Sequence, residues 1–253
     1  MSWLHALILG LVQGLTEFFP VSSSAHLKIF KTFFNLNSSE ETVLFDLFCH
    51  LGTFLALVYY FRKDIYNLLT HQRRMLIPLA AALLPLVPFY VLLKPVREAL
   101  SNPSYLGYCM IGTVGLLYLA GRLKSQQKTA WTIKDSLWIG TLQAVALIPG
   151  FSRSAATITG GLWRGLTMHE AVRFSFLLSL PAVAGGTFLE LFKAKSHLFS
   201  ETTQLPHCII GFAAAAVAGI VVIRHAIPFL QKGHLKPFTW YCLIVGILLI
   251  LYL

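Results

Sequence analysis

Charged side chains are scarce in this sequence of 253 residues. Only 12% of the residues are Asp, Glu, Lys or Arg, and 56% are hydrophobic. A soluble globular domain usually contains about 25% charged residues. The mean hydropathy is +0.69. This composition excludes an ordinary soluble domain and predicts an integral membrane protein.

Acidic residues are the scarcer of the two charged classes. Ten Asp and Glu stand against 20 Lys and Arg, which gives a formal net charge of +10. The basic residues lie in short loops between apolar segments, such as 62–63, 73–74 and 122–134. Because such loops set the orientation of helices in a bilayer, we predict a membrane partner and no nucleic-acid partner.

Cysteines at metal-binding or redox spacing are also missing. The four cysteines stand singly within or beside apolar segments, which excludes a C-x-x-C site and favours packing roles. They are Cys49, Cys109, Cys208 and Cys242. The N-terminal apolar segment has neither the basic start nor the cleavage site of a signal peptide, so we expect it in the mature protein.

Long apolar stretches, by contrast, are abundant. Six of them approach the roughly 17–25 residues that a spanning helix needs. They are Leu44–Phe61, Leu76–Leu93, Tyr105–Ala120, Phe174–Phe192, Cys208–Ile223 and Phe238–Leu253. We therefore predict an all-α polytopic membrane protein with six transmembrane helices in a single membrane domain, residues 1–253.

Two further apolar runs are too short to span a membrane. Trp3–Phe19 stops at Pro20, and Leu137–Ile148 stops at Pro149. Proline breaks a helix, and the freed backbone groups cannot be left in lipid, so such breaks survive only where protein or a watery cavity covers them. We predict two re-entrant helical hairpins, each of which enters and leaves the membrane on the same side.

The two short runs also resemble each other, with an offset that settles at 129 residues. The matched pairs are Gly10 with Gly140, Gln13 with Gln143, Pro20 with Pro149 and Ser23 with Ser152. This favours an internal duplication, with halves of about 1–121 and 122–253. The alternative is a chance match between apolar stretches.

The loop charges predict how the halves are oriented. Thirteen Lys and Arg fall in loops 62–75, 122–136, 164–173 and 224–236; six fall in loops 94–104 and 193–206 and in the first hairpin. By the positive-inside rule the first set is cytoplasmic. The hairpins then enter from opposite faces, as in an inverted-topology repeat, and meet near the midplane.

The second break, Pro149–Thr157, has the features of an anion site. Gly150 permits a tight turn, and a helix start after it offers unpaired N–H groups and a positive dipole end. Arg153 adds a planar fork that fits phosphate oxygens. The hydroxyls available to complete the shell belong to Ser152, Ser154 and Thr157. The alternative is that Arg153 snorkels to an interface.

The first break supplies reactive groups. Gln13 and Glu17 are four residues apart and share a helix face. An intramembrane carboxylate is costly and therefore a functional candidate. It can ligate Mg²⁺ or Ca²⁺ with the Gln13 carbonyl as a second ligand, orient a histidine, or act as a base. The structural alternative is a protonated carboxyl that only forms hydrogen bonds.

A hydroxyl-rich segment with a histidine follows. It contains Ser22, Ser23, Ser24 and His26. His26 can activate a serine as a base or attack phosphorus itself. Serines also pack well between membrane helices, and a lone histidine is often structural. Together with Glu17 and Arg153 across one cavity, the set predicts chemistry on a phosphorylated substrate in the bilayer.

These motifs resemble those of the undecaprenyl-diphosphate phosphatase, or bacitracin-resistance, family over nearly the whole chain. The matching residues are Gln13 and Glu17, Pro20–Ser23 with His26, and the block Pro149–Thr157. The resemblance implies an enzyme of the bacterial inner (plasma) membrane that hydrolyses undecaprenyl diphosphate to undecaprenyl phosphate and phosphate. It would recycle the lipid carrier of cell-wall synthesis and confer bacitracin resistance.

The resemblance also implies residue roles. Glu17, with Gln13, would bind a divalent cation (Mg²⁺ or Ca²⁺) or transfer a proton. Ser23 and His26 would be nucleophile and base, or His26 the nucleophile. Arg153 would hold the diphosphate, helped by Ser22, Ser24, Ser152, Ser154 and Thr157. The site would open toward the periplasmic, outer face.

Three positions depart from the family pattern. Gln13 replaces the commoner Glu and leaves one carboxylate in its motif, His50 stands where Gln is frequent, and Arg173 where Glu is usual. We leave His50 out of the predicted site. A flippase or secondary transporter that uses the same anion site is the alternative function, and a homodimer is compatible with the sequence.

Overall fold

The computed structural model describes residues 1–36, 40–123, 127–193 and 205–253. Within these ranges the chain is helical and contains no strand, only one isolated bridge between Lys128 and Leu166. This confirms the all-α prediction. Residues 124–126 and 194–204, which carry part of the predicted loop charges, lie outside the described ranges, so the charge-based topology stays a prediction.

In the described part of the chain, five apolar segments are long enough to cross a membrane: Val43–Thr70, Arg73–Leu92, Pro103–Arg122, Met168–Glu190 and Leu205–Gln231. Three of them are single helices: α3 (Glu40–Thr70), α10 (Met168–Lys193) and α11 (Leu205–Gln231). The second segment consists of η1 (Arg73–Met75), α4 (Leu76–Ala81) and α5 (Leu86–Leu92), and the third consists of η2 (Pro103–Tyr105) and α7 (Leu106–Arg122). The short helix α6 (Lys94–Ala99) lies between these two segments. Five of the six predicted spans are thus matched. The sixth corresponds to α12 (Lys236–Tyr252), which has 17 residues.

The predicted span Leu76–Leu93 is not one continuous helix. It divides into α4, which ends at Ala81, and α5, which begins at Leu86 after Pro85. Proline lacks the N–H that an interior helix position needs. The sequence pattern predicted the length of this segment correctly and missed its break.

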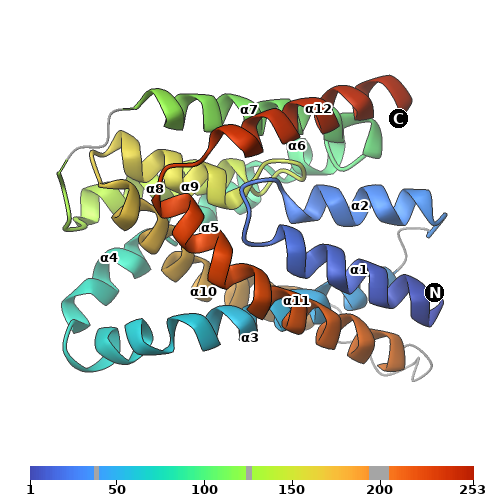
Figure 1. The fold of residues 1–253 in the computed structure, drawn as a ribbon, viewed down its shortest axis with the longest axis horizontal. Coiled ribbons are helices and arrows are strands. Elements are labelled where there is room, and N and C mark those ends of the chain that lie inside the picture. The colour runs from blue at the N-terminus through green and yellow to red at the C-terminus, as the bar shows by residue number, and fades with distance from the viewer. Residues whose placement is uncertain (37–39, 124–126, 194–204) are drawn as a thin grey trace.

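Two pairs of shorter helices form hairpins, as shown in Figure 1: α1 (Trp3–Thr16) with α2 (Ser23–Phe33), and α8 (Ile133–Val145) with α9 (Arg153–Trp163). In each, aromatic rings join the two helices. The rings of His5 and Phe34 stack 4.5 Å apart, and those of Trp138 and Trp163 meet at 5.4 Å. The first hairpin lies on the side of both chain ends, and the second lies on the opposite side.

Close backbone packing positions the first hairpin. A Cβ added at Gly10 would lie 2.5 Å from the Gly211 carbonyl oxygen, and one added at Gly14 would lie 2.6 Å from Ala218 Cβ. Helix α1 therefore touches α11 directly, in the manner of small-residue interfaces between membrane helices. This contact fixes the C-terminal end of α1, where Glu17 follows.

A buried aspartate anchors the second hairpin at its far end. Asp135 completes a capping box with Thr132 and forms ion pairs with Lys128 Nζ and with Arg164 Nε, the latter at 2.9 Å. Asp135 lies outside the spanning segments. Burial acts to raise its pKa, but hydrogen bonds from Lys128 and Thr132 outweigh burial and lower the pKa to about 2. The start of α8 is thereby tied to the residue that follows α9.

Candidate functional site

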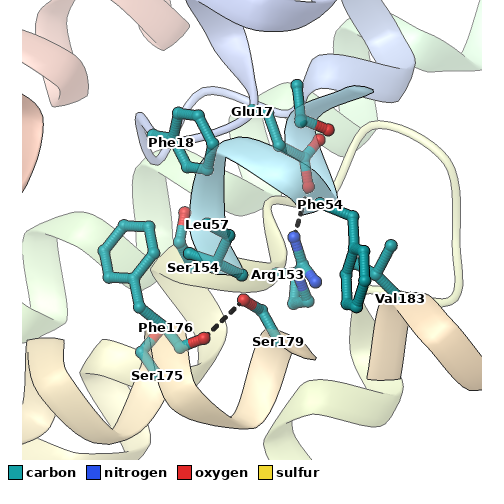
Figure 2. A pocket seen from close by; sticks show the side chains of 11 residues that line it. Glu17, Phe18, Phe54, Leu57, Arg153, Ser154, Ser175, Phe176, Ser179 and Val183 are labelled. Atoms are coloured by element: carbon teal, nitrogen blue, oxygen red, sulfur yellow. Dashed lines mark hydrogen bonds and ion pairs between the residues drawn. The ribbon is translucent and has the colours of Figure 1, made fainter. Parts of the chain in front are cut away.

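The turns of the two hairpins meet at Glu17 and Arg153. Glu17 ends α1, and Arg153 is the first residue of α9. Arg153 Nη2 donates a hydrogen bond to Glu17 Oε1 within an ion pair, and the carboxylate side chain is only 6% exposed. Figure 2 shows the guanidinium directed at Glu17, with Phe54 and Val183 beside the pair. The structure thus joins the two polar groups that the sequence motifs singled out.

Ser23 shares the carboxylate of Glu17. Its Oγ donates to Glu17 Oε2 at 2.6 Å, and Gln13 Nε2 donates to the same oxygen at 2.9 Å. A carboxylate that accepts hydrogen bonds at both oxygens is placed as an ionised acceptor. A serine hydroxyl held by such a carboxylate has a base in contact with the proton that it must lose to become a nucleophile.

His26 lies elsewhere. Its Nδ1 is 2.8 Å from the Ser22 carbonyl oxygen, its Nε2 is 2.7 Å from the Tyr241 hydroxyl, and the residue is buried. A carbonyl only accepts, so Nδ1 carries the hydrogen and Nε2 accepts from Tyr241. Within the described ranges no hydrogen bond joins His26 to Ser23, and the structure does not bring these two predicted partners together.

The predicted phosphate-binding block divides into two groups. Ser152 Oγ accepts from the Ala155 N–H and lies 3.2 Å from Ser154 Oγ, and both serines line the cavity described below. Thr157 Oγ1 instead lies 2.6 Å from Ser175 Oγ on α10 and is buried. Thr157 therefore holds α9 against α10 and does not face the cavity.

Two helix starts contribute to this site. Helix α2 begins at Ser23, after Ser22 in the left-handed region (φ 66°), and no side chain caps it. Ser22 and Ser24 line the cavity, and their hydroxyl oxygens lie 3.3 Å apart. Helix α9 begins at Arg153. Unpaired N–H groups and positive dipole ends at both starts favour a bound anion.

A cavity of about 450 Å³ connects these elements. Its polar side consists of the two turns, and its remaining wall comes from α3, α5 and α10. The wall residues on these helices include Leu47, His50, Tyr90, Val183, Gly186, Thr187, Leu189 and Glu190. The volume falls in the range of ligand pockets, about 300–1,000 Å³. Apolar side chains such as Leu47, Val183 and Leu189 lie in the same cavity as these polar groups, which suits an amphiphilic ligand.

A second, much narrower pocket lies against the same ion pair (Figure 2). Its volume of about 10 Å³ has room for roughly one water molecule. Its polar lining includes Thr53, Ser154, Ser175 and Ser179, and Phe18 and Phe176 close it with apolar surface. Glu17 and Arg153 therefore line both the wide cavity and this small pocket.

The sequence interpretation left out of the predicted site a cavity residue that contacts Gln13. His50 on α3 places Nδ1 2.8 Å from Gln13 Nε2 and 3.8 Å from Glu17 Oε2, and it lines the cavity. The signal that could have identified it is a histidine inside a long apolar run. Its neighbours could not be read from the sequence, because Gln13 and His50 lie on different helices.

The predicted cation ligands, Gln13 and Glu17, take part in a shared hydrogen-bond network. Gln13 presents its amide nitrogen to Glu17, its carbonyl oxygen is buried without a hydrogen-bond partner, and both Glu17 oxygens accept from other donors. Mg²⁺ and Ca²⁺ require oxygen ligands with free lone pairs. Among the described residues no group of three or more His, Cys, Asp or Glu is placed to hold a metal. Gln13 Oε1 keeps such lone pairs free beside Glu17, and the divalent cation expected at these two residues stays a prediction.

Residues 6–248 match the family model described as bacitracin resistance protein BacA. An undecaprenyl-diphosphatase of Protochlamydia amoebophila is 36% identical over 254 residues, which cover 100% of this chain and 99% of the relative. One from Thermodesulfovibrio yellowstonii is 37% identical over 240 residues, 93% and 91% of the two chains. Undecaprenyl-diphosphatase 3 of Bacillus cereus is 36% identical over 258 residues, 99% and 97%.

Proposed function

This chain belongs to the family of the bacitracin resistance protein BacA, and from that premise we propose that it is an undecaprenyl-diphosphatase whose chemistry takes place where its two hairpins meet. The reaction converts undecaprenyl diphosphate and water to undecaprenyl phosphate and inorganic phosphate, which regenerates the lipid carrier of cell-wall synthesis. One observation carries the mechanism: Ser23 Oγ donates at 2.6 Å to Glu17, whose other oxygen is paired with Arg153.

Substrate binding begins with an exchange of partners at Arg153. Its guanidinium is paired with the Glu17 carboxylate, and a phosphate offers the same two-pronged acceptor with more charge. The diphosphate therefore takes the place of Glu17 on Arg153, with the helix starts and the hydroxyls of Ser24, Ser152 and Ser154 around it. The prenyl chain leaves along the apolar wall at Val183 and Leu189.

The first chemical step transfers the terminal phosphoryl group to Ser23. Glu17 accepts the hydroxyl proton, Ser23 Oγ forms a bond to the terminal phosphorus, and the bond from that phosphorus to the bridging oxygen breaks. Undecaprenyl phosphate leaves with the electron pair of that bond. Arg153 and the helix starts stabilise the charge that develops on the phosphoryl oxygens.

The second step is hydrolysis of the phosphoserine. Water attacks phosphorus, the bond to Ser23 Oγ breaks, and protonated Glu17 returns its proton to that oxygen. The water supplies the fourth oxygen of the released phosphate, and its excess proton passes to bulk water. Ser23 and Glu17 are then restored. No step is routed through a metal, and the divalent-cation requirement stays a prediction.

His26 serves in this proposal as a positioning residue. Its Nδ1–H donates to the Ser22 carbonyl oxygen, and its Nε2 is held by Tyr241 on α12. These two bonds fix the turn that starts α2 and so place Ser23. Helix α12 thereby supports the nucleophile from outside both hairpins.

The membrane arrangement is part of the proposal. We place α12 as the sixth span, both hairpins as re-entrant segments of an inverted repeat, and the cavity open to the outer face of the bacterial plasma membrane. The contacts at the hairpin ends and the positions of the hairpins on opposite sides support this arrangement. The basic loops support the same orientation.

The direct test is phosphate release from undecaprenyl diphosphate by the purified protein in detergent, with and without a chelator. We expect turnover in the wild type and its loss in Glu17→Gln. Ser101→Ala, at an exposed serine before η2, is a matched control that should keep full turnover. Transport of the lipid in vesicles without phosphate release would instead support the flippase alternative.

A further inference from the structure

His50 lines the cavity but has no role in the mechanism above. It lies on α3, its side chain is 30% exposed, and the same cavity is lined by Ser23 and Arg153. An imidazole in an apolar spanning helix is an unusual cavity wall. Its neighbours define which of its nitrogens carries the hydrogen.

Gln13 provides that information. Its amide nitrogen lies 2.9 Å from Glu17 Oε2 and 2.8 Å from His50 Nδ1. An ionised carboxylate only accepts, so the amide atom that faces it must be the donor nitrogen, because the amide oxygen would be repelled. The same nitrogen donates its second hydrogen to His50 Nδ1. That ring nitrogen is therefore an acceptor, and the ring hydrogen lies on Nε2.

The Nε2–H group of His50 is left available. In the described part of the chain nothing forms a hydrogen bond with this nitrogen, whereas the opposite ring edge is fixed by the buried Gln13. Arg153 pairs with Glu17 Oε1, while His50 Nδ1 lies 3.8 Å from Oε2. Arg153 and His50 thus lie next to different oxygens of the Glu17 carboxylate. An anion that replaces the Glu17 carboxylate on Arg153 therefore lies near both Arg153 and His50.

We propose that His50 is a substrate-binding residue, which donates a hydrogen bond from Nε2 to a phosphate oxygen of the bound diphosphate while Gln13 holds the ring. The inference rests on the proposed function, since the ligand is the diphosphate of that reaction. It adds a third helix, α3, to the binding site formed by the two hairpins. It also assigns a purpose to the buried amide of Gln13, which is to orient a donor.

Two amide substitutions separate this role from a packing role. His50→Gln places an N–H donor near the position of Nε2, whereas His50→Asn keeps a polar group near Nδ1 and removes the distal donor. Methylenediphosphonate, a diphosphate that cannot be hydrolysed, serves as the binding probe in calorimetry. We expect His50→Asn to weaken its binding about tenfold, the loss of one hydrogen bond to a charged group. His50→Gln should weaken it less than about threefold.

Steady-state kinetics with undecaprenyl diphosphate should repeat this order, with the larger change in KM than in kcat. Binding by His50→Asn at the wild-type level, or an equal loss in both variants, would overturn the assignment. Melting temperatures of the detergent-solubilised variants check that the fold is intact. The calorimetry does not require turnover, so a wild type that binds the probe but releases no phosphate refutes the proposed function alone.

A measurement on the wild type covers the case in which the variants do not fold. Diethylpyrocarbonate acylates accessible neutral imidazoles, and peptide mass spectrometry reports the site. We expect methylenediphosphonate to protect His50 and leave the exposed His225 reactive. Equal labelling of His50 with and without the probe would contradict the proposed contact.

Discussion

The two hairpins start a helix beside the same cavity but place different chemistry there. The first residue of α2 is Ser23, and the first residue of α9 is Arg153. The α9 start is capped, because Ser152 Oγ accepts from a backbone N–H of the first turn, while Ser22 makes no such bond at α2. The second hairpin therefore uses a serine to cap its helix start, whereas the first places the Ser23 hydroxyl against the Glu17 carboxylate.

The turns before these two helices also differ in backbone strain. Gly150 has a φ of 99° and Ser22 a φ of 66°. Glycine adopts positive φ without penalty, whereas a residue with a side chain held in a sparsely populated region costs about 1–3 kcal/mol. The hydrogen bond from His26 to the Ser22 carbonyl oxygen helps to hold that conformation. Strain thus lies next to the proposed nucleophile and is absent from the anion-binding turn.

The largest effect should come from exchanging the two helix-start serines for alanine. We expect Ser23→Ala to lower kcat by about a thousandfold or more, as expected for a lost nucleophile. Ser152→Ala should cost about 1 kcal/mol of stability through the lost cap and reduce turnover far less. Phosphate release and thermal melting measure both. Equal losses of turnover in the two variants would remove the distinction between the hairpins.

The second test concerns the guanidinium of α9. Arg153→Lys should lower kcat/KM about a hundredfold, because an ammonium cannot form the two-pronged phosphate contact. Arg164→Lys is the matched control, since Arg164 follows the same helix but pairs with Asp135 away from the cavity. Near-normal turnover of Arg153→Lys would contradict the assignment of the second hairpin to anion binding.

The third test measures how substitutions in the two turns change the stability of the protein. Gly150→Ala should destabilise the protein by about 2 kcal/mol or more, because φ is 99° and the new Cβ would lie 2.4 Å from Cys109 Cβ. Ser22→Gly should stabilise it by up to about 1 kcal/mol, since it relieves the strain. Thermal or denaturant unfolding in detergent measures both changes in stability. A stabilising Gly150→Ala would show that the two turns are not distinguished by strain.

The last expected effect is a pH dependence of stability that comes from the second hairpin and is seen only in acid. The pKa of Asp135 is lowered to about 2 from 3.8, so its stabilisation is complete above pH 3.8 and is lost as the pH falls through 2. The contribution is about 2 kcal/mol. Unfolding measured between pH 5 and 2 should show this loss in the wild type. Asp135→Asn should be less stable at neutral pH and should not show this loss of stability in acid. A variant with the same pH profile as the wild type would contradict the role of Asp135.

Local signals explain why much of this site could be predicted from the sequence. A proline after a short apolar run indicates a broken helix, and a carboxylate or guanidinium beside it indicates a polar interior. Glu17, Ser23 and Arg153 were found in this way, and the structure brings them together. The long apolar stretches likewise predicted a helical membrane protein.

Partners on distant helices could not be predicted. His26 was expected to be the base for Ser23 or the nucleophile itself, and its ring contact with Tyr241, 215 residues away, was not foreseen. The Ser23 hydroxyl instead contacts Glu17, after a Ser22 with a positive φ angle that the sequence does not reveal. The contact of Gln13 with His50 likewise depends on how α1 packs beside α3.

The identity of the phosphoryl acceptor tests the central claim most directly. The wild-type protein should be mixed with undecaprenyl diphosphate labelled at the terminal phosphorus and quenched within the first turnover, half in acid and half in base. Peptide mapping should then place an acid-stable label on Ser23. An acid-labile label on His26, or turnover without any labelled peptide, would contradict an account in which the first hairpin supplies a serine nucleophile with Glu17 as its base.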